Sequence, residues 1–336
     1  MAYTERYVTQ AASGGDGTIG SPWTLAEAFA QAVAGDRVNI QSDDGYSISG
    51  LSISNSGVAN GKICFRGYDS SIGDLDAQGA NSDGSLNTTN FPVITTTAAI
   101  VPNNHSVLQN LNITGSFSGR IVDNSTGDFV TICSCKILHS GNLALATVAR
   151  IDDDCIFINS EFECTGATHS TVLEIDARGV IINCRFIGNS SSANLLSLWG
   201  GYISGCTFWG GNIAINSENE TGTLMILNST IYNSAIAIGL ADASQSYVPI
   251  LVNVHYTDCA TGINNQYSAT ADKNVLEINT RTRDNTTLRI GIAEECVHFG
   301  EVTTDTGGWA TDYVDAPNGD LTLISTAAGI DTGLGM

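Results

Sequence analysis

The chain has 336 residues, and its 34 acidic residues outnumber its 13 basic ones, which gives a formal net charge of −21. A surface of that sign opposes binding to nucleic acid, to anionic membranes and to polyuronate chains. No run of 18 apolar residues occurs, so we expect no membrane-spanning helix and one elongated soluble domain.

Residues 1–50 predict a short strand, a helix and a second strand. Tyr7 and Val8 lead into a loop rich in Gly, Asp and Ser, and residues 24–34 follow with an Ala-rich amphipathic pattern that is typical of a helix. Residues 35–40 return to a strand pattern. A helix at this place would cover the open end of a stack of strands.

A short phrase recurs seven times between residues 109 and 256: apolar residues, then Asn, Ser or Gly, a small or aliphatic residue, any residue, and Phe, Ile or Tyr. Successive turn positions are 24, 25, 24, 22, 23 and 25 residues apart. The flanking runs are short and rich in β-branched and aromatic residues, which predicts strands. The period therefore predicts a solenoid with coils of 22–25 residues. The turn positions are Asn110, Ser134, Asn159, Asn183, Gly205, Asn228 and Asn253.

Equivalent residues of successive coils would stack at about 4.8 Å, the spacing between paired strands. Asn tolerates the left-handed backbone region and Gly adopts it freely, so we expect the turn positions to form a left-handed ladder with hydrogen bonds between Asn side chains. Alternation along the next strand predicts two inward rows and a polar, solvent-facing row between them. The first inward row is Leu111, Cys135, Ser160, Cys184, Cys206, Ser229 and Val254. The second is Ile113, Ile137, Phe162, Phe186, Phe208, Ile231 and Tyr256. The outward row is Asn112, Lys136, Glu161, Arg185, Thr207, Thr230 and His255.

The nine cysteines are odd in number and scattered, and three of them occupy the first inward row. A cysteine at such a position is typical of a small buried hydrophobe. We therefore expect free structural thiols.

The division that follows has three parts. We expect residues 1–50 to form the N-terminal cap and first coil, residues 51–265 the solenoid, and residues 266–336 a β-rich closing segment that either covers the last coil or makes contacts between subunits. A longer loop around residues 74–90 interrupts the solenoid. Beyond residue 265 the repeated phrase is lost.

The repeat and its Asn turns resemble the right-handed parallel β-helix of the pectate-lyase-like superfamily. The segment from Ser21 to Ala30 also resembles the capping helix at the start of that fold. The resemblance covers residues 100–265 well and the rest loosely. It implies an all-β fold, a right-handed parallel β-helix with an N-terminal capping helix.

The candidate catalytic cluster is Asp152, Asp154, Asp176 and Arg178. Hydrolases of this fold need carboxylates that converge on one groove, and lyases need a basic residue with Ca²⁺ or cationic side chains beside the substrate acid. Asp152 and Asp176 are 24 residues apart, so they are expected on neighbouring coils. The cluster is interpreted either as a Ca²⁺ site or as a hydrolytic carboxylate pair, and Ca²⁺ is the only cofactor that it suggests.

The alternative interpretation of these charges is structural. Lys136, Glu161 and Arg185 fall on successive coils with alternating sign, and cross-strand pairs of that kind stabilise a sheet by about 0.2–1 kcal/mol each without any substrate. The Asn-Thr-Asp, Gly-His-Gly and Arg-Ile-Lys motifs of polygalacturonases and the Arg-x-Pro-x-x-Arg element of pectate lyases are missing from the sequence. We favour the structural interpretation and assign no catalytic residue.

The remaining candidates are histidines and aromatic residues. The five His residues are isolated, without a spacing typical of metal ligands, so we predict no metal site. Trp199, Tyr202 and Trp209 fall within one coil. Packing or a subunit interface is their expected use, and stacking on sugar rings is the alternative.

Two functions remain. The favoured one follows from a resemblance to the parallel β-helix proteins of tailed-phage virions, which are commonly trimeric. The resemblance implies a virion structural protein, a capsid decoration or cement protein or a spike or fibre subunit, that forms a homo-trimer and contacts capsid or tail proteins. The start of the chain lacks the basic and apolar regions of a signal peptide, which agrees with synthesis in the host cytoplasm and a final place in the virion. The alternative is an extracellular carbohydrate-active enzyme, a polysaccharide lyase or glycoside hydrolase, that acts on a surface glycan.

Overall fold

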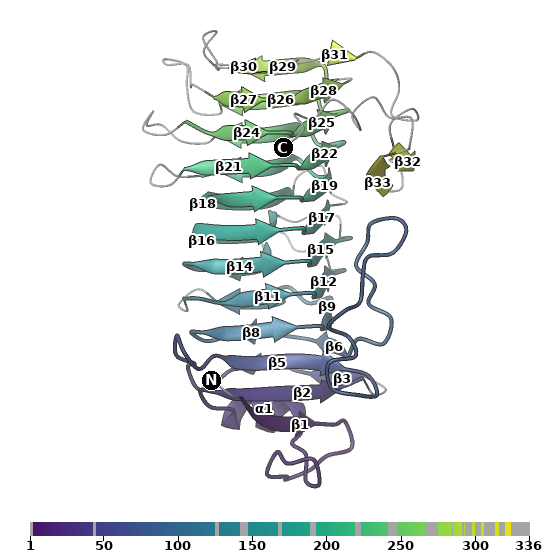
Figure 1. Ribbon diagram of the computed structural model, residues 1–336, viewed down its shortest axis with the longest axis vertical. Helices are drawn as coiled ribbons and strands as arrows, with labels where there is room; N and C mark the ends of the chain where they lie inside the picture. The colour runs from purple at the N-terminus through teal and green to yellow at the C-terminus, as the bar shows by residue number, and fades with distance from the viewer. Residues whose placement is uncertain are drawn as a thin grey trace.

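A computed structural model shows parallel strands stacked along one long axis, with a helix at the N-terminal end of the stack (Figure 1). The prediction of an all-β parallel β-helix is confirmed. The structure describes residues 3–42, 45–124, 128–141, 147–166, 170–188, 193–218, 223–240, 248–265, 275–283, 285–290, 292, 298–299, 304–305, 313–315 and 320–323.

The parallel strands form a 20-stranded and an 11-stranded sheet. The larger sheet covers two faces of the solenoid, joined through two long strands, so we describe three faces and call them the first, second and third sheet in their order along a coil. The first sheet contains β1 (Thr4–Val8), β2 (Asp36–Gln41), β5 (Ile63–Tyr68), β8 (Ser106–Gln109), β11 (Thr131–Cys133), β14 (Cys155–Ile158), β21 (Leu224–Leu227), β24 (Ile250–Val252), β27 (Leu276–Ile278) and β30 (His298–Phe299). The second contains β3 (Tyr46–Ile48), β6 (Val93–Thr96), β9 (Asn112–Gly115), β12 (Lys136–His139), β15 (Glu161–Cys164), β17 (Arg185–Gly188), β19 (Thr207–Gly210), β22 (Thr230–Tyr232), β25 (His255–Thr257), β28 (Arg281–Arg283) and β31 (Thr304–Asp305).

The third sheet contains β4 (Leu51–Ser52), β7 (Ile100–Val101), β10 (Val122–Asn124), β13 (Thr147–Ile151), β20 (Ile213–Ser217), β23 (Ile236–Leu240), β26 (Thr261–Asn265) and β29 (Thr287–Ile290). Two long strands, β16 (Thr171–Ile182) and β18 (Asn194–Ser204), begin in the third sheet and end in the first. Outside the stack, β32 (Tyr313–Asp315) and β33 (Asp320–Leu323) pair in antiparallel fashion.

The core is built from columns of equivalent side chains. Both predicted inward rows are buried. Within the second row, the rings of Phe162 and Phe186 lie 5.4 Å apart and those of Phe186 and Phe208 lie 4.8 Å apart, close to parallel. Each fully buried ring contributes about 1.5–3 kcal/mol, so the parallel register is held by its apolar columns as well as by backbone hydrogen bonds.

The helix α1 (Leu25–Gln31) lies against the first coils (Figure 1). It begins with a capping box, in which Thr24 Oγ1 accepts from the Glu27 N–H at 3.1 Å and the Glu27 carboxylate accepts from the Thr24 N–H at 2.8 Å. Its buried Phe29 contacts the ring of Phe65 at 4.5 Å. The helix is shorter than the expected 24–34, because Ala32 already leaves helical geometry with a ψ of 136°.

The seven turn positions all have left-handed backbone geometry, with φ between 47° and 65°. Gly205 adopts this conformation without a side chain, and a Cβ atom there would lie 2.3 Å from Asn183 Oδ1, so the Asn183 side chain would have to move. Side-chain hydrogen bonds link Asn253 to Asn228 at 2.9 Å and Asn279 to Asn253 at 2.7 Å. Asn279, with a φ of 51°, extends the ladder past residue 265, where β27, β28 and β29 continue the parallel stacking.

The described cysteines are free thiols, as predicted. Burial raises the pKa of Cys259 to about 12, so it stays protonated near neutral pH. The serines of the first inward row also accept hydrogen bonds from backbone N–H groups of the preceding coil. Ser160 Oγ accepts from the Cys135 N–H and Ser229 Oγ from the Cys206 N–H, both at 3.2 Å, which explains the small polar residues there.

Candidate functional site

The loop that follows β5 folds over the outer side of the second sheet. Asp76 holds it there, because its carboxylate accepts from Asn110 Nδ2 at 2.7 Å and from Gln109 Nε2 at 3.0 Å and pairs with Arg66 at 3.1 Å. Further along the loop, the Leu86 N–H donates to Glu161 at 3.2 Å. The loop therefore covers the start of the turn ladder and the strands beside it.

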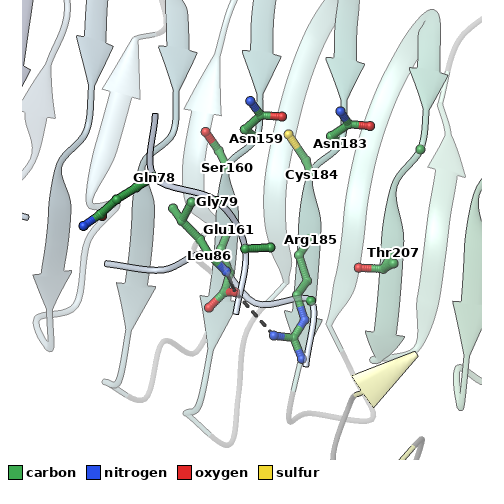
Figure 2. A pocket seen from close by; sticks show the side chains of 13 residues that line it. Gln78, Gly79, Leu86, Asn159, Ser160, Glu161, Asn183, Cys184, Arg185 and Thr207 are labelled. Carbon is green, nitrogen blue, oxygen red and sulfur yellow. Dashed lines mark hydrogen bonds and ion pairs between the residues drawn. The ribbon is translucent and has the colours of Figure 1, made fainter. Parts of the chain in front are cut away.

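A pocket of about 380 Å³ lies between this loop and the coils below it (Figure 2). Its wall on the solenoid side is formed by the turn ladder and by the starts of β15, β17 and β19, and its other wall by the loop. The lining residues are Gln78, Gly79, Ala80, Gly84, Leu86, Asn159, Ser160, Glu161, Asn183, Cys184, Arg185, Gly205 and Thr207.

Glu161 is the central charged group of this pocket, and it is only 1% exposed. This corrects the prediction that the whole outward row faces solvent: the loop covers Glu161, and the charge is retained because partners surround it. Its carboxylate bonds Lys136 at 2.7 Å and Arg185 at 3.4 Å (Figure 2 shows the Arg185 contact). Lys136 also pairs with Glu163 at 2.8 Å. Although burial opposes the ammonium charge, these two carboxylates outweigh it and raise the pKa of Lys136.

The alternating charges Lys136, Glu161 and Arg185 thus form one ion-pair chain across three coils, in direct register. Glu161 is the one acidic side chain that lines the described part of the pocket. Its oxygens are occupied by two cations and a backbone N–H. The arrangement suits the joining of coils and of the loop better than proton transfer to a substrate.

The candidate carboxylates lie elsewhere, on the third sheet and at the corner that leads to the first. Asp176 bonds Arg150, with Nε at 2.7 Å. Register places Asp152 beside Asp176, since Ile151 pairs with Ile175. Burial raises the pKa of Asp152, and the neighbouring acidic groups, including Asp176, raise it further.

The other two candidates form a separate surface pair. Asp154 and Arg178 lie 3.4 Å apart, with 40% and 74% of their side chains exposed. The predicted cluster is therefore divided into two ion-paired sets, Asp176 with Arg150 and Asp154 with Arg178. Within the described ranges, no group of three or more His, Cys, Asp and Glu side chains is arranged to hold a metal ion.

A shallow groove of about 650 Å³ runs along the outer side of the first sheet, beside the Asp154–Arg178 pair. Its lining is mostly apolar. We did not predict this groove from the sequence, because the only outward row that the repeat identified is the polar row that follows the turn ladder. A signal was present: β14, β21 and β24 read Cys-Ile-Phe-Ile, Leu-Met-Ile-Leu and Ile-Leu-Val. Continuous apolar runs of this kind are typical of strands covered on both faces.

The three aromatic residues of one coil are divided among different surfaces. Tyr202 lines the first-sheet groove and Trp209 lies on β19 of the second sheet. Trp199 lies where β18 passes from the third sheet to the first, and it is 38% exposed. The structure therefore does not bring them together as one sugar-stacking platform.

A comparison with solved structures supports the fold. A crystal structure of pectate lyase Pel9A is similar over 97% of this chain and 89% of that one, with a TM-score of 0.53 and 12% identity. A rhamnogalacturonan lyase is similar over 96% of both chains, with a TM-score of 0.49 and 13% identity. The sequence profile of the family described as Adenovirus EB1 55K protein / large t-antigen matches residues 136–298. A comparison with curated protein sequences found no match. At this identity, the likeness to Pel9A establishes the parallel β-helix and not an activity.

No helix among the described residues has both the length and the apolar character needed to cross a bilayer.

Proposed function

We propose that the chain is a structural subunit of a virus particle, the β-helical body of a tailed-phage spike, fibre or capsid decoration protein. The observation that carries the proposal is that the charged side chains of both candidate sites form ion pairs between neighbouring coils. Lys136, Glu161 and Arg185 bond from coil to coil beneath the loop, and Arg150 bonds Asp176 of the next coil. Such pairs stiffen a rod, and at a catalytic centre they would occupy the groups that must exchange protons with substrate.

Three further features agree with this proposal. Residues 136–298 match a family described as Adenovirus EB1 55K protein / large t-antigen, which suggests a viral protein and names no place in the particle. The cysteines of the described part are buried or half-buried free thiols, which suits a protein that folds without oxidation. A net charge of −21 keeps single chains soluble until they meet a specific partner. A homo-trimer in contact with capsid or tail proteins is the assembly we propose.

The test is the location of the chain in purified particles. An antibody raised against the recombinant chain should label particles isolated by density gradient from a lysate of the source culture, and mass spectrometry of washed particles should find its peptides in a fixed ratio to the major capsid protein. Absence of the chain from washed particles, with its presence in the soluble fraction, would contradict the virion role.

The alternative function is a carbohydrate-active enzyme, and the likeness to pectate lyase Pel9A favours it. The corresponding test incubates the purified chain with polygalacturonate, rhamnogalacturonan and bacterial surface polysaccharides, with and without Ca²⁺, and follows new reducing ends and unsaturated products. Asp152→Asn with Asp176→Asn, and separately Glu161→Gln, would then show which of the two sites acts. Turnover that survives both sets of substitutions would place the chemistry elsewhere on the chain.

A further inference from the structure

The outer side of the first sheet carries a feature that neither the ion pairs nor the pocket explains. From β14 to β27, two outward rows stack in continuous register. Eleven of the twelve side chains are apolar or aromatic, with Ser204 as the exception, and none is charged. We call these rows the apolar face. The first row is Ile156, Val180, Tyr202, Met225, Ile250 and Leu276, and the second is Ile158, Ile182, Ser204, Leu227, Val252 and Ile278.

These side chains are half-exposed in the single chain, and Val180 reaches 37%. Six strands at about 4.8 Å give the face a length of about 24 Å, and the two rows lie about 7 Å apart. With about 5 Å added in each direction for the width of the side chains, the area is on the order of 300–400 Å². The largest contiguous apolar patch on a typical soluble monomer has this size and is often functional. Such a patch can serve as the apolar centre of an interface of about 800 Å² per partner.

We infer that the apolar face is where a second copy of this chain packs, which names the partner surface of the assembly role proposed above and rests on it. Charge is the first argument. The second sheet presents Lys136, Glu163 and Arg185 outward, and the third presents Arg150 and Glu174. Two chains of charge −21 repel each other least where both are uncharged, and the apolar face is such a surface.

Period is the second argument. The rows repeat at the spacing of the coils, so a flat partner must offer side chains at the same spacing over several coils. Another copy of this solenoid offers side chains at that spacing, because its coils repeat at the same distance. The rows of one copy can then pack into the gaps between the rows of the other. The edges supply a polar rim, with the Asn ladder on one side and the Asp154–Arg178 pair on the other.

The test compares charged substitutions on and off this face. Val180→Lys combined with Met225→Lys places two ammonium groups in the centre of the first row, and Ile187→Lys is the control at a half-exposed apolar position on the outer side of β17. Lys makes the chain less negative, so dissociation by the double variant cannot come from greater overall repulsion. The molecular mass is measured by light scattering behind size exclusion over a hundredfold range of concentration.

We expect a multiple of 35.1 kDa for the wild type and for Ile187→Lys, and 35.1 kDa for the double variant, with unchanged circular dichroism. The milder pair Val180→Ser and Met225→Ser should raise the dissociation constant at least tenfold, and it decides the matter if the Lys variant does not fold. A monomeric wild type, or an oligomer that survives both pairs, overturns the inference.

The outcomes for the interface and for the virion role separate cleanly. An oligomer broken by the first-sheet variants, in a chain missing from particles, keeps the interface and removes the virion role. A chain that is found in particles but is monomeric in solution keeps the virion role and removes the interface.

Discussion

Replacement of Asn253 by Val is the sharpest test of the turn ladder. Asn253 has a φ of 53°, donates through Nδ2 to Asn228 Oδ1 at 2.9 Å, and accepts from Asn279 Nδ2 at 2.7 Å. Val is β-branched, so it strains in the left-handed region, and it can make neither bond. The substitution therefore removes a backbone preference and two inter-coil contacts together.

The expected loss is about 2–3 kcal/mol in the free energy of unfolding. A side-chain-bearing residue in the left-handed region costs about 1–2 kcal/mol. Each of the two hydrogen bonds contributes about 0.5–1.5 kcal/mol, toward the lower end because Asn253 is half-exposed. Urea unfolding followed by circular dichroism measures the loss.

Asn253→Gly is the matched control, since Gly adopts a φ of 53° without strain and loses only the side-chain bonds. It should cost about half as much as Val. Equal stability of the Val variant and the wild type, or a Gly variant less stable than the Val variant, would refute the argument from backbone conformation.

Three other predictions follow from the charged and titratable groups. Glu161→Gln leaves the Lys136 and Arg185 charges without their shared carboxylate, so we expect a loss of about 2–3 kcal/mol and faster limited proteolysis of the loop around residues 69–90; a resistant loop would count against the coupling. Asp152→Asn should be neutral or slightly stabilising at pH 7, because the raised pKa of Asp152 indicates that its charged form is disfavoured. Asp176→Asn should instead cost about 1 kcal/mol, because it weakens the bond to Arg150. Equal shifts in the melting temperature of the two variants would contradict this prediction. Burial lowers the pKa of His139 below its ordinary value of 6.5, and the neutral ring accepts from the Gly141 N–H at 3.1 Å. The stabilising contribution of His139 is therefore complete above about pH 6.5 and is lost as the pH falls through its folded pKa. In the His139→Gln variant, the free energy of unfolding should decrease less steeply below pH 6.5 than in the wild type. An unchanged slope would assign that decrease to other groups.

The repeat in the sequence was sufficient to predict the coils. A fixed side-chain period of two and a turn that needs left-handed backbone leave one register for Phe162, Phe186 and Phe208, because a slip by one residue would turn them to solvent. Local preferences thus agree with the stacked fold. The amphipathic pattern of residues 24–34 likewise predicted the helix α1, which ends at Gln31.

The continuation of the stack beyond residue 265 was harder to read, because the interior residues change character there. Glu277 takes an inward position opposite Leu251, is buried, and bonds the Tyr256 hydroxyl at 3.1 Å and the Arg289 guanidinium. A buried charge with its partners satisfied can replace an aliphatic residue. The pattern of apolar residues then fails although the coil continues.

What the sequence by itself determined is what repeats from coil to coil: the stacked parallel strands beside the turn, the left-handed turns, the two inward rows and the free thiols. Only the tertiary structure decided what happens between parts that are distant along the chain. The loop held by Asp76 buries Glu161 and makes a pocket, and Arg150 takes Asp176 from the candidate cluster. Such contacts depend on which surfaces meet after the coils have formed, and the period of a repeat carries no information about an insertion that folds back across it.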